Sequence, residues 1–245
     1  MTSVVTGAGQ GLGRAIALAF SERGDAVVVS DINGQSAEST AQEIRDRGGD
    51  AVGIQADASV EADMVALADG AEDAFGPLGV WVNNAGVTRP AMLHKMELAD
   101  FDLVMAVHAR GTFLGIREAA RRMIASSTPG AILNVTSSAG LQGTLGQINY
   151  SAAKGAIVAQ TKSAALELAR YGIRVNAVAP VADTPMTHTL KTDEKLAPKF
   201  LSAIPLRRFG TAEEAAQAFA YLSSSSASYI TGQVLCVDGG LYMAS

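Results

Sequence analysis

The chain has 245 residues, of which 48% are hydrophobic and 18% charged, and its formal net charge is −5. This mild acidity argues against nucleic acid as the main partner, and no run of apolar residues is long enough for a membrane span. The single cysteine, Cys236, excludes an intrachain disulfide and a cysteine zinc site, so a reducing, cytoplasmic location is expected.

Strand and helix signals alternate along the chain. Short runs rich in Val, Ile and Ala, typical of buried parallel strands, occupy 3–6, 26–30, 51–56, 80–84, 131–137, 173–179 and 233–239. Helix-sized amphipathic stretches fill the gaps at 11–23, 34–47, 60–75, 100–125, 149–171 and 211–222. This order predicts an α/β protein with a single-domain Rossmann fold over residues 1–245. Its doubly wound, seven-stranded parallel sheet is flanked by helices.

One segment interrupts this rhythm. Residues 181–210 contain Pro185, Pro198 and Pro205 and form a long connection for a compact domain. Connections of this length are often functional, so we expect a lid over a site.

Glycines gather in the segment TGAGQGLG (Thr6–Gly13), which follows the first predicted strand and opens the first predicted helix. In such a turn Gly7 allows the tight bend, Gly11 lets the backbone approach a pyrophosphate, and Gly13 allows close helix–sheet packing. The positive end of the helix would then face the phosphates. The position of the turn predicts a dinucleotide site.

Asp31 ends the second predicted strand, where a carboxylate can accept hydrogen bonds from the adenosine ribose and would repel a 2′-phosphate. No Arg or Lys follows it at once, and Gln10 rather than a basic residue precedes Gly11. The sequence therefore favours NAD, with NADP less favoured. Asp31 also fits a simpler role as the start of a turn with Asn33 and Gly34.

Tyr150 and Lys154 are four positions apart in a predicted helix, so they share one face, and Ser137 ends the fifth predicted strand. A tyrosine hydroxyl with a pKa of about 10 is a poor base at neutral pH. A neighbouring ammonium group favours its phenolate, and a serine hydroxyl can hold a substrate oxygen. The spacing alone is equally compatible with a packed Tyr and a surface Lys.

Several motifs occur together: TGAGQGLG, Asp57, NNAG at 83–86, Ser137, YSAAK at 150–154, Asn176, PVADTPM at 180–186 and TGQVLCVDGG at 231–240. Over essentially the whole chain this combination resembles the short-chain dehydrogenase/reductase family, and its β-ketoacyl reductase-like branch in particular. The resemblance implies that Tyr150 is the catalytic acid/base and Ser137 orients the substrate oxygen. It also implies that Lys154 binds the nicotinamide ribose and lowers the Tyr150 pKa, and that Thr184 holds the carboxamide.

The family resemblance also implies a homotetramer or homodimer. Taken with the strand ends, it predicts these cofactor contacts: Gly7, Gln10, Gly11, Leu12, Gly13, Asp31, Ile32, Asp57, Ala58, Asn83, Ala85, Gly86, Tyr150, Lys154, Pro180, Thr184 and Met186.

Two positions depart from the family pattern. His108 stands where the family commonly has an asparagine that holds a relay water, and it is taken here as a fourth catalytic residue. A histidine can bind water and titrate near neutral pH, but it can equally well fill space in a helix. Val181 replaces a glycine that usually follows the proline, which changes the backbone beside the nicotinamide.

These observations predict an NAD-dependent oxidoreductase that interconverts a secondary alcohol and a ketone, with no metal. The expected substrate is a small, mainly hydrophobic molecule in a pocket formed by Val87, Leu141, Leu145, Val181 and His188. One alternative is a 3-oxoacyl reductase, acting on carrier-protein or CoA substrates with NADPH. Arg121 matches one basic residue of carrier-protein enzymes, but Tyr171 stands where a second would be. Another alternative is a non-catalytic dinucleotide-binding sensor.

Overall fold

Seven parallel strands form the centre of the molecule in a computed structural model that describes residues 1–187, 192 and 196–243. Their order in the sheet is β3-β2-β1-β4-β5-β6-β7. The topological switch point, where the strand order reverses, lies between β1 and β4. The strands are β1 (Thr2–Thr6), β2 (Ala26–Asp31), β3 (Ala51–Gln55), β4 (Leu78–Asn83), β5 (Gly130–Val135), β6 (Ile173–Pro180) and β7 (Val234–Val237). This arrangement confirms the predicted doubly wound Rossmann fold.

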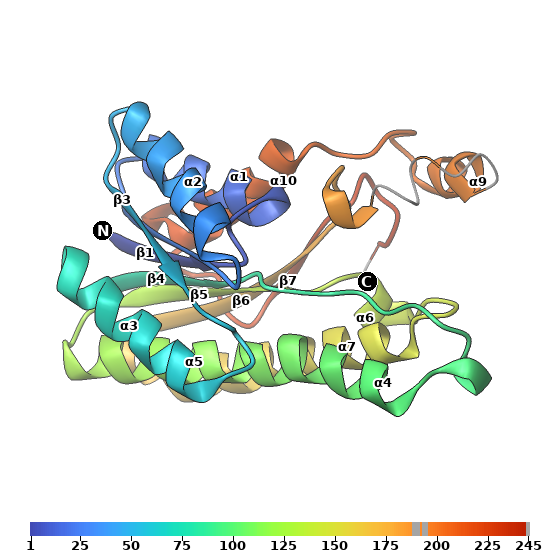
Figure 1. The fold of residues 1–245 in the computed structure, drawn as a ribbon, viewed down its shortest axis with the longest axis horizontal. Coiled ribbons are helices and arrows are strands. Elements are labelled where there is room, and N and C mark those ends of the chain that lie inside the picture. Colours follow the sequence, from blue (N-terminus) through green and yellow to red (C-terminus); the bar gives the residue numbers. More distant parts are fainter. Residues whose placement is uncertain (188–191, 193–195, 244–245) are drawn as a thin grey trace.

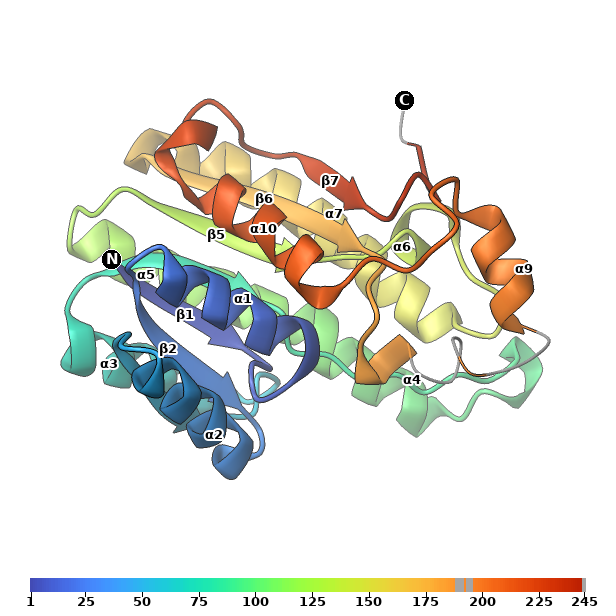
Figure 2. The ribbon, with the colours of Figure 1, turned by 90° about the horizontal axis from the view of Figure 1, so that it is seen from above.

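Helices cover both faces of the sheet (Figure 1). On one face lie α1 (Gly11–Glu22), α2 (Gly34–Asp46) and α10 (Ala212–Ser223), which are nearest the viewer in Figure 2. On the other lie α3 (Glu61–Phe75), α4 (Leu98–Met105), α5 (Gly111–Ala125) and α7 (Ile148–Leu168). The central strands are buried on both sides, and β4 and β5 accordingly consist mainly of apolar residues.

Each face has its own hydrophobic core. Phe20 of α1 and Phe219 of α10 pack in the first, and Trp81 of β4 and Met123 of α5 pack in the second. No helix in the described part of the chain is both long and apolar enough to cross a membrane.

The predicted helix 100–125 is divided in the structure. A π-helical turn, η2 (Ala106–Arg110), separates α4 from α5 and contains the buried His108. Such turns insert an extra residue into a helix and are frequent at functional sites. The periodicity of apolar residues does not detect this insertion, because α4 and α5 continue along one axis.

Several short elements complete the fold. They are η1 (Leu93–Lys95), α6 (Ala139–Gln142), η3 (Ala169–Tyr171), η4 (Pro185–Thr187), α9 (Leu196–Ala203) and η5 (Ser225–Ala227). All except η3, which lies within the predicted helix 149–171, fall outside the predicted helices. Of these, η4 and α9 belong to the segment expected to form a lid, and α9 lies near the carboxyl ends of β6 and β7 (Figure 2). Whether this segment closes over the site stays a prediction.

Candidate active site

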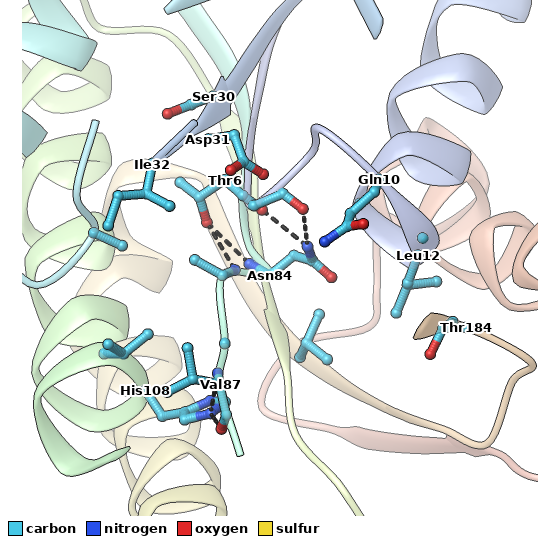
Figure 3. A pocket seen from close by; sticks show the side chains of 18 of the residues that line it. Thr6, Gln10, Leu12, Ser30, Asp31, Ile32, Asn84, Val87, His108 and Thr184 are labelled. Atoms are coloured by element: carbon cyan, nitrogen blue, oxygen red, sulfur yellow. Dashed lines mark hydrogen bonds between the residues drawn. The ribbon is translucent and has the colours of Figure 1, made fainter. Parts of the chain in front are cut away.

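A cavity of about 570 Å³ opens at the carboxyl edge of the sheet. It begins at the glycine turn and Asp31 and continues to His108 and Val87 (Figure 3). Its walls include most of the predicted cofactor contacts: Gly7, Gln10, Gly11, Leu12, Gly13, Asp31, Ile32, Asp57, Ala58, Ala85, Gly86, Tyr150, Lys154, Pro180 and Thr184. The cavity therefore lies at the topological switch point of the sheet, where ligands bind in open α/β folds.

The glycine turn is shaped by backbone conformation and close packing. Gly7 and Gly11 have φ angles of +62° and +56°, which side chains other than glycine rarely adopt. A Cβ on Gly13 would lie 2.3 Å from the carbonyl oxygen of Gly7. The turn can therefore bring its backbone N–H groups and the positive end of α1 against an anionic ligand.

Asn84 holds this turn from the neighbouring strand. Its Nδ2 donates hydrogen bonds to the carbonyl oxygens of Thr6 and Gly7, each at 2.9 Å, and it lines the cavity. Asn84 belongs to the NNAG motif at the end of the fourth predicted strand but is not among the predicted cofactor contacts. The only available signal was its place directly after β4.

Asn83 lies elsewhere. Its side chain is buried, accepts a hydrogen bond from Trp81 Nε1 and donates one to Asn134 Oδ1, both at 2.9 Å. It is not among the residues that line the cavity. Successive residues of a strand point to opposite faces, so only one of the two asparagines can face the glycine turn. A cofactor contact of Asn83 stays a prediction.

Asp31 combines the two roles considered for it. One carboxylate oxygen accepts from the Gly9 N–H and the other from the Asn33 N–H, each at 3.0 Å, so the residue does organise a turn. The carboxylate is also partly exposed and lines the cavity. Asn33 in turn caps α2 by accepting from the Ser36 N–H.

Tyr150 and Lys154 occupy the first turns of α7, and Ser137 follows β5. The Lys154 side chain is buried, and its Nζ donates to the carbonyl oxygen of Val135 at 2.6 Å and lies 5.4 Å from the Tyr150 ring centroid. Thr136 Oγ1 donates to the Lys154 carbonyl oxygen at 2.9 Å. These contacts join the start of α7 to the end of β5, so the three predicted catalytic residues lie together.

Burial governs the protonation of this group. It raises the pKa of Tyr150 to about 12, and a hydrogen bond from Ser137 opposes this by favouring the phenolate. Burial lowers the pKa of Lys154 to about 7. The expected lowering of the Tyr150 pKa by Lys154 is not present in this structure, because desolvation dominates and Val135 holds the lysine.

His108 lies against the same group. Its ring meets the Tyr150 ring edge to face at a centroid distance of 5.3 Å, and its Nε2 is 3.0 Å from Val87 N and 2.8 Å from Val87 O. A Cβ on Gly86 would lie 2.4 Å from His108 Cε1, so this close approach requires glycine. Its Nδ1 is buried with no hydrogen-bond partner among the described residues.

The idea that His108 titrates near neutral pH is wrong in this environment. Burial, together with the charge of Lys154, lowers its pKa to about 3. The imidazole is therefore neutral at physiological pH, and it contacts the loop after β4 through whichever tautomer pairs with Val87. The roles open to a neutral His108 are to bind a water at Nδ1 or to position Val87.

The predicted substrate pocket is only partly assembled by the described residues. Val87 lines the cavity, whereas Val181 lines a separate small hollow and Leu145 is 85% exposed. Leu141 is half-buried but does not line the cavity. Met186 lies in η4, and His188 lies outside the described residues. Contact of these residues with a substrate stays a prediction.

No metal site is apparent in the part of the chain that the structure describes, since it holds no group of three or more His, Cys, Asp or Glu side chains placed to bind an ion.

Comparison with known proteins agrees with this geometry. The family model described as enoyl-(acyl carrier protein) reductase matches residues 7–242. The chain belongs to the short-chain dehydrogenase/reductase family. It is therefore an oxidoreductase of a family that binds nicotinamide dinucleotides.

The relatives are matched over almost their whole length. A 3-oxoacyl-[acyl-carrier-protein] reductase, FabG, from Staphylococcus aureus is 41% identical over 246 residues, 99% of this chain and 98% of the relative. A (3R)-3-hydroxyacyl-CoA dehydrogenase from Rattus norvegicus is 38% identical over 250 residues, 98% of this chain and 96% of the relative. The crystal structure of sorbitol-6-phosphate 2-dehydrogenase SrlD from Erwinia amylovora superposes with a TM-score of 0.93 at 34% identity, covering 99% of this chain and 100% of that one.

Proposed function

We propose that this oxidoreductase interconverts 3-oxoacyl and 3-hydroxyacyl compounds, with NAD(H) as cofactor and Tyr150 as acid/base. A 3-oxoacyl compound is one case of the ketone predicted from the sequence. The names of the S. aureus and rat relatives support this narrower class. The acyl carrier, a protein or CoA, is left open, because Arg121 is exposed but its Nη1 bonds to Glu118, and Tyr171 supplies no charge.

One observation carries the proposal: Tyr150 and Lys154 line the same cavity as the glycine turn, with Ser137 next to Tyr150. Close packing at Gly13 seats the start of α1 against the end of β1, and Gly11, with a φ of +56° and no side chain, leaves its backbone accessible to a dinucleotide pyrophosphate. The residues present therefore fit the family's cofactor.

In this mechanism the bound cofactor supplies or accepts the hydride. During reduction, Tyr150 donates its hydroxyl proton to the carbonyl oxygen, and the Ser137 hydroxyl donates a hydrogen bond to that oxygen. The raised pKa of Tyr150 keeps it protonated and ready for this step. Lys154 would hold the ribose of the bound cofactor, and its ammonium group would stabilise the tyrosinate that forms.

His108 has a positioning role in this scheme. By pairing with Val87 it holds the loop that borders the nicotinamide end of the cavity, and its neutral ring adds no charge beside Tyr150. Its Nδ1 is placed to hold a buried water.

The choice of NAD is supported by the position of charges along the cavity. The Asp31 carboxylate lies at the adenosine end (Figure 3), where it would repel a 2′-phosphate. The two cations among the described lining residues are Arg89 and Lys154, and both belong to the end near Val87 and Tyr150. A cytoplasmic location and a homodimeric or homotetrameric state stay predictions.

Tyr150→Phe tests the proposal. With acetoacetyl-CoA and NADH, we expect its kcat to fall by about 10²- to 10⁴-fold, while the NADH Kd stays at the wild-type value. Tyr229→Phe, at a fully exposed position, is the matched control and should keep its activity. Near-normal turnover in Tyr150→Phe would show that the acid/base assignment is wrong.

Cofactor choice is measured in the same assay. The wild-type protein should bind NADH more tightly than NADPH, and Asp31→Ala should reduce that preference. Tighter binding of NADPH by the wild type would contradict the assignment to NAD. Cofactor binding without turnover of any ketone or alcohol would favour the non-catalytic sensor.

A further inference from the structure

We propose that Arg89 binds an anionic group of the substrate, a carboxylate or a phosphate, at the end of the cavity remote from Asp31. The inference rests on the proposed function, because the anion is placed on the same molecule whose carbonyl meets Tyr150. It changes the expected substrate from a mainly hydrophobic molecule to one with an apolar body and a charged end.

Arg89 lines the cavity two residues after Val87. Its lining neighbours at this end include the apolar side chains of Leu103 and Val107. Lys154 is the other cation among the described lining residues, but its side chain is buried, bonds to Val135 in this structure and is assigned to the cofactor ribose in the proposed function. Of the described lining residues, Arg89 therefore has the cationic group that remains for an incoming substrate.

The backbone of Arg89 is fixed relative to the catalytic tyrosine. The Asn149 side chain is fully buried; its Nδ2 donates to the Arg89 carbonyl oxygen at 2.9 Å, and its Oδ1 accepts from the Tyr150 N–H at 2.8 Å. The same Nδ2 lies 3.3 Å from the Asp100 carbonyl oxygen, which ties in the start of α4. One amide thus ties the backbone of Arg89 to that of Tyr150.

The guanidinium itself makes one hydrogen bond to the described residues, from Nη1 to the Thr88 carbonyl oxygen at 2.8 Å, and one long ion pair. Arg89 Nε lies 3.6 Å from Asp100 Oδ1, and the two side chains are 49% and 41% exposed. Exposed ion pairs of this kind contribute little stability. By contrast, Arg14 contacts both carboxylate oxygens of Glu43, at 2.8 and 2.6 Å. A substrate anion could therefore replace Asp100 at Arg89 and form a bidentate pair at low cost.

Substitution of Asp100 should have the opposite effect on substrate binding to substitution of Arg89. Its carboxylate competes for the guanidinium and repels an anion, so Asp100→Asn should strengthen binding of a charged substrate. Its backbone carbonyl, which Asn149 contacts, is unchanged by this substitution. Arg89→Gln should weaken binding of the same substrate. A role in stability alone would not produce these opposite effects.

The test compares matched charged and neutral substrates in reduction assays with NADH. One pair is acetoacetate and ethyl acetoacetate, which isolates a carboxylate. The other is acetoacetyl-CoA and its N-acetylcysteamine thioester, which isolates the phosphates of the longer carrier. For each pair the measured quantity is the ratio of kcat/KM for the charged substrate to that for the neutral one.

In at least one pair we expect Arg89→Gln to lower this ratio about tenfold through KM, and Asp100→Asn to raise it. Arg47→Gln, an equal charge change at the residue after α2, should leave the ratio unchanged. The pair that responds identifies the carboxylate or the phosphate as the ligand. Unchanged ratios in both pairs with Arg89→Gln would overturn the proposal, while Tyr150-dependent turnover would leave the proposed function intact.

A binding measurement covers the case in which no substrate is turned over, which would count against the proposed function itself. Saturation-transfer NMR reports on the subsite without catalysis. One experiment compares the binding of butyrate with that of ethyl butyrate. A second experiment measures whether inorganic phosphate competes with butyrate. Selective loss of butyrate binding, or of phosphate competition, in Arg89→Gln supports the subsite. Equal binding of these probes to the wild type and Arg89→Gln refutes it.

Discussion

Lys154 is unfavourable for the stability of the free protein but useful for its proposed catalysis. The fold places its ammonium in a buried position against a single carbonyl oxygen, and this lowers its pKa to about 7. The same position lets it approach a ribose and support the Tyr150 phenolate. Catalysis therefore requires a group that destabilises the free protein when it is charged.

Lys154→Met should change how stability depends on pH. Because the lysine pKa is about 7 in the folded chain and about 10.5 in the unfolded chain, the unfolded chain binds more protons between these limits. Stability from this group is therefore lost as pH falls from about 10 towards 7 and regained as pH rises. The wild-type unfolding free energy should rise by up to about 1.4 kcal/mol per pH unit, or roughly 3 °C in Tm.

Thermal unfolding of the cofactor-free protein between pH 7 and 9.5 measures this slope. The upper limit avoids Tyr150, whose raised pKa lowers stability above about pH 10. Lys154→Met should show a smaller slope than the wild type. Parallel curves for the two proteins would mean that Lys154 is not desolvated in solution.

At the scale of elements, the turn between β1 and α1 depends on contacts with the loop after β4. Asn84 bonds to the carbonyls of Thr6 and Gly7, and the space where a Cβ of Gly13 would lie is already filled by Gly7 O and Ala8 Cα. The cradle is thus formed by two chain segments that are far apart in sequence.

Gly13→Ala should damage this cradle. Its Cβ would come within 2.3 Å of the Gly7 carbonyl oxygen and 2.8 Å of Ala8 Cα, so the backbone must move. We expect a loss of about 1–3 kcal/mol of stability and at least a tenfold rise in the NADH Kd, measured by thermal unfolding and calorimetry.

Gly155→Ala is the control for this substitution. In α7 the nearest atom to the added Cβ is Gly140 O at 3.4 Å, and alanine favours a helix. Its Tm should be equal to or higher than that of the wild type. A Gly13→Ala protein that behaved like Gly155→Ala would show that the turn relaxes without cost.

For the whole molecule, the layer formed by α5 and α7 has apolar side chains that are not covered within the chain. Leu166 of α7 is 84% exposed, and Phe113 and Ile124 of α5 are 49% and 37% exposed. Large exposed apolar side chains on adjacent helices are typical of interfaces. They support association through this layer.

Leu166→Glu should weaken the assembly. Light scattering after size exclusion should give the wild type a multiple of the 25.2 kDa chain mass, and the variant a smaller species. Leu206→Glu, at a 66% exposed position outside this layer, is the control and should keep the wild-type mass. A wild-type protein that elutes as a single chain would contradict the predicted homodimer or homotetramer.

The sequence by itself determined the order of strands and helices, the glycine turn, and the pairing of Tyr150 with Lys154. These features depend on local periodicity and on residues a few positions apart, so they can be recognised without a fold. The alternation also predicted the doubly wound sheet, and the comparisons confirm the family resemblance.

Only the tertiary structure decided which side chains meet across distant segments. Asn84 rather than Asn83 faces the glycine turn, His108 sits in a π-helical turn against Val87, and Asn149 joins Arg89 to Tyr150. The protonation of His108 and Lys154 was likewise unpredictable, because it depends on burial. Burial and long-range hydrogen bonds arise from packing, which local sequence patterns do not encode.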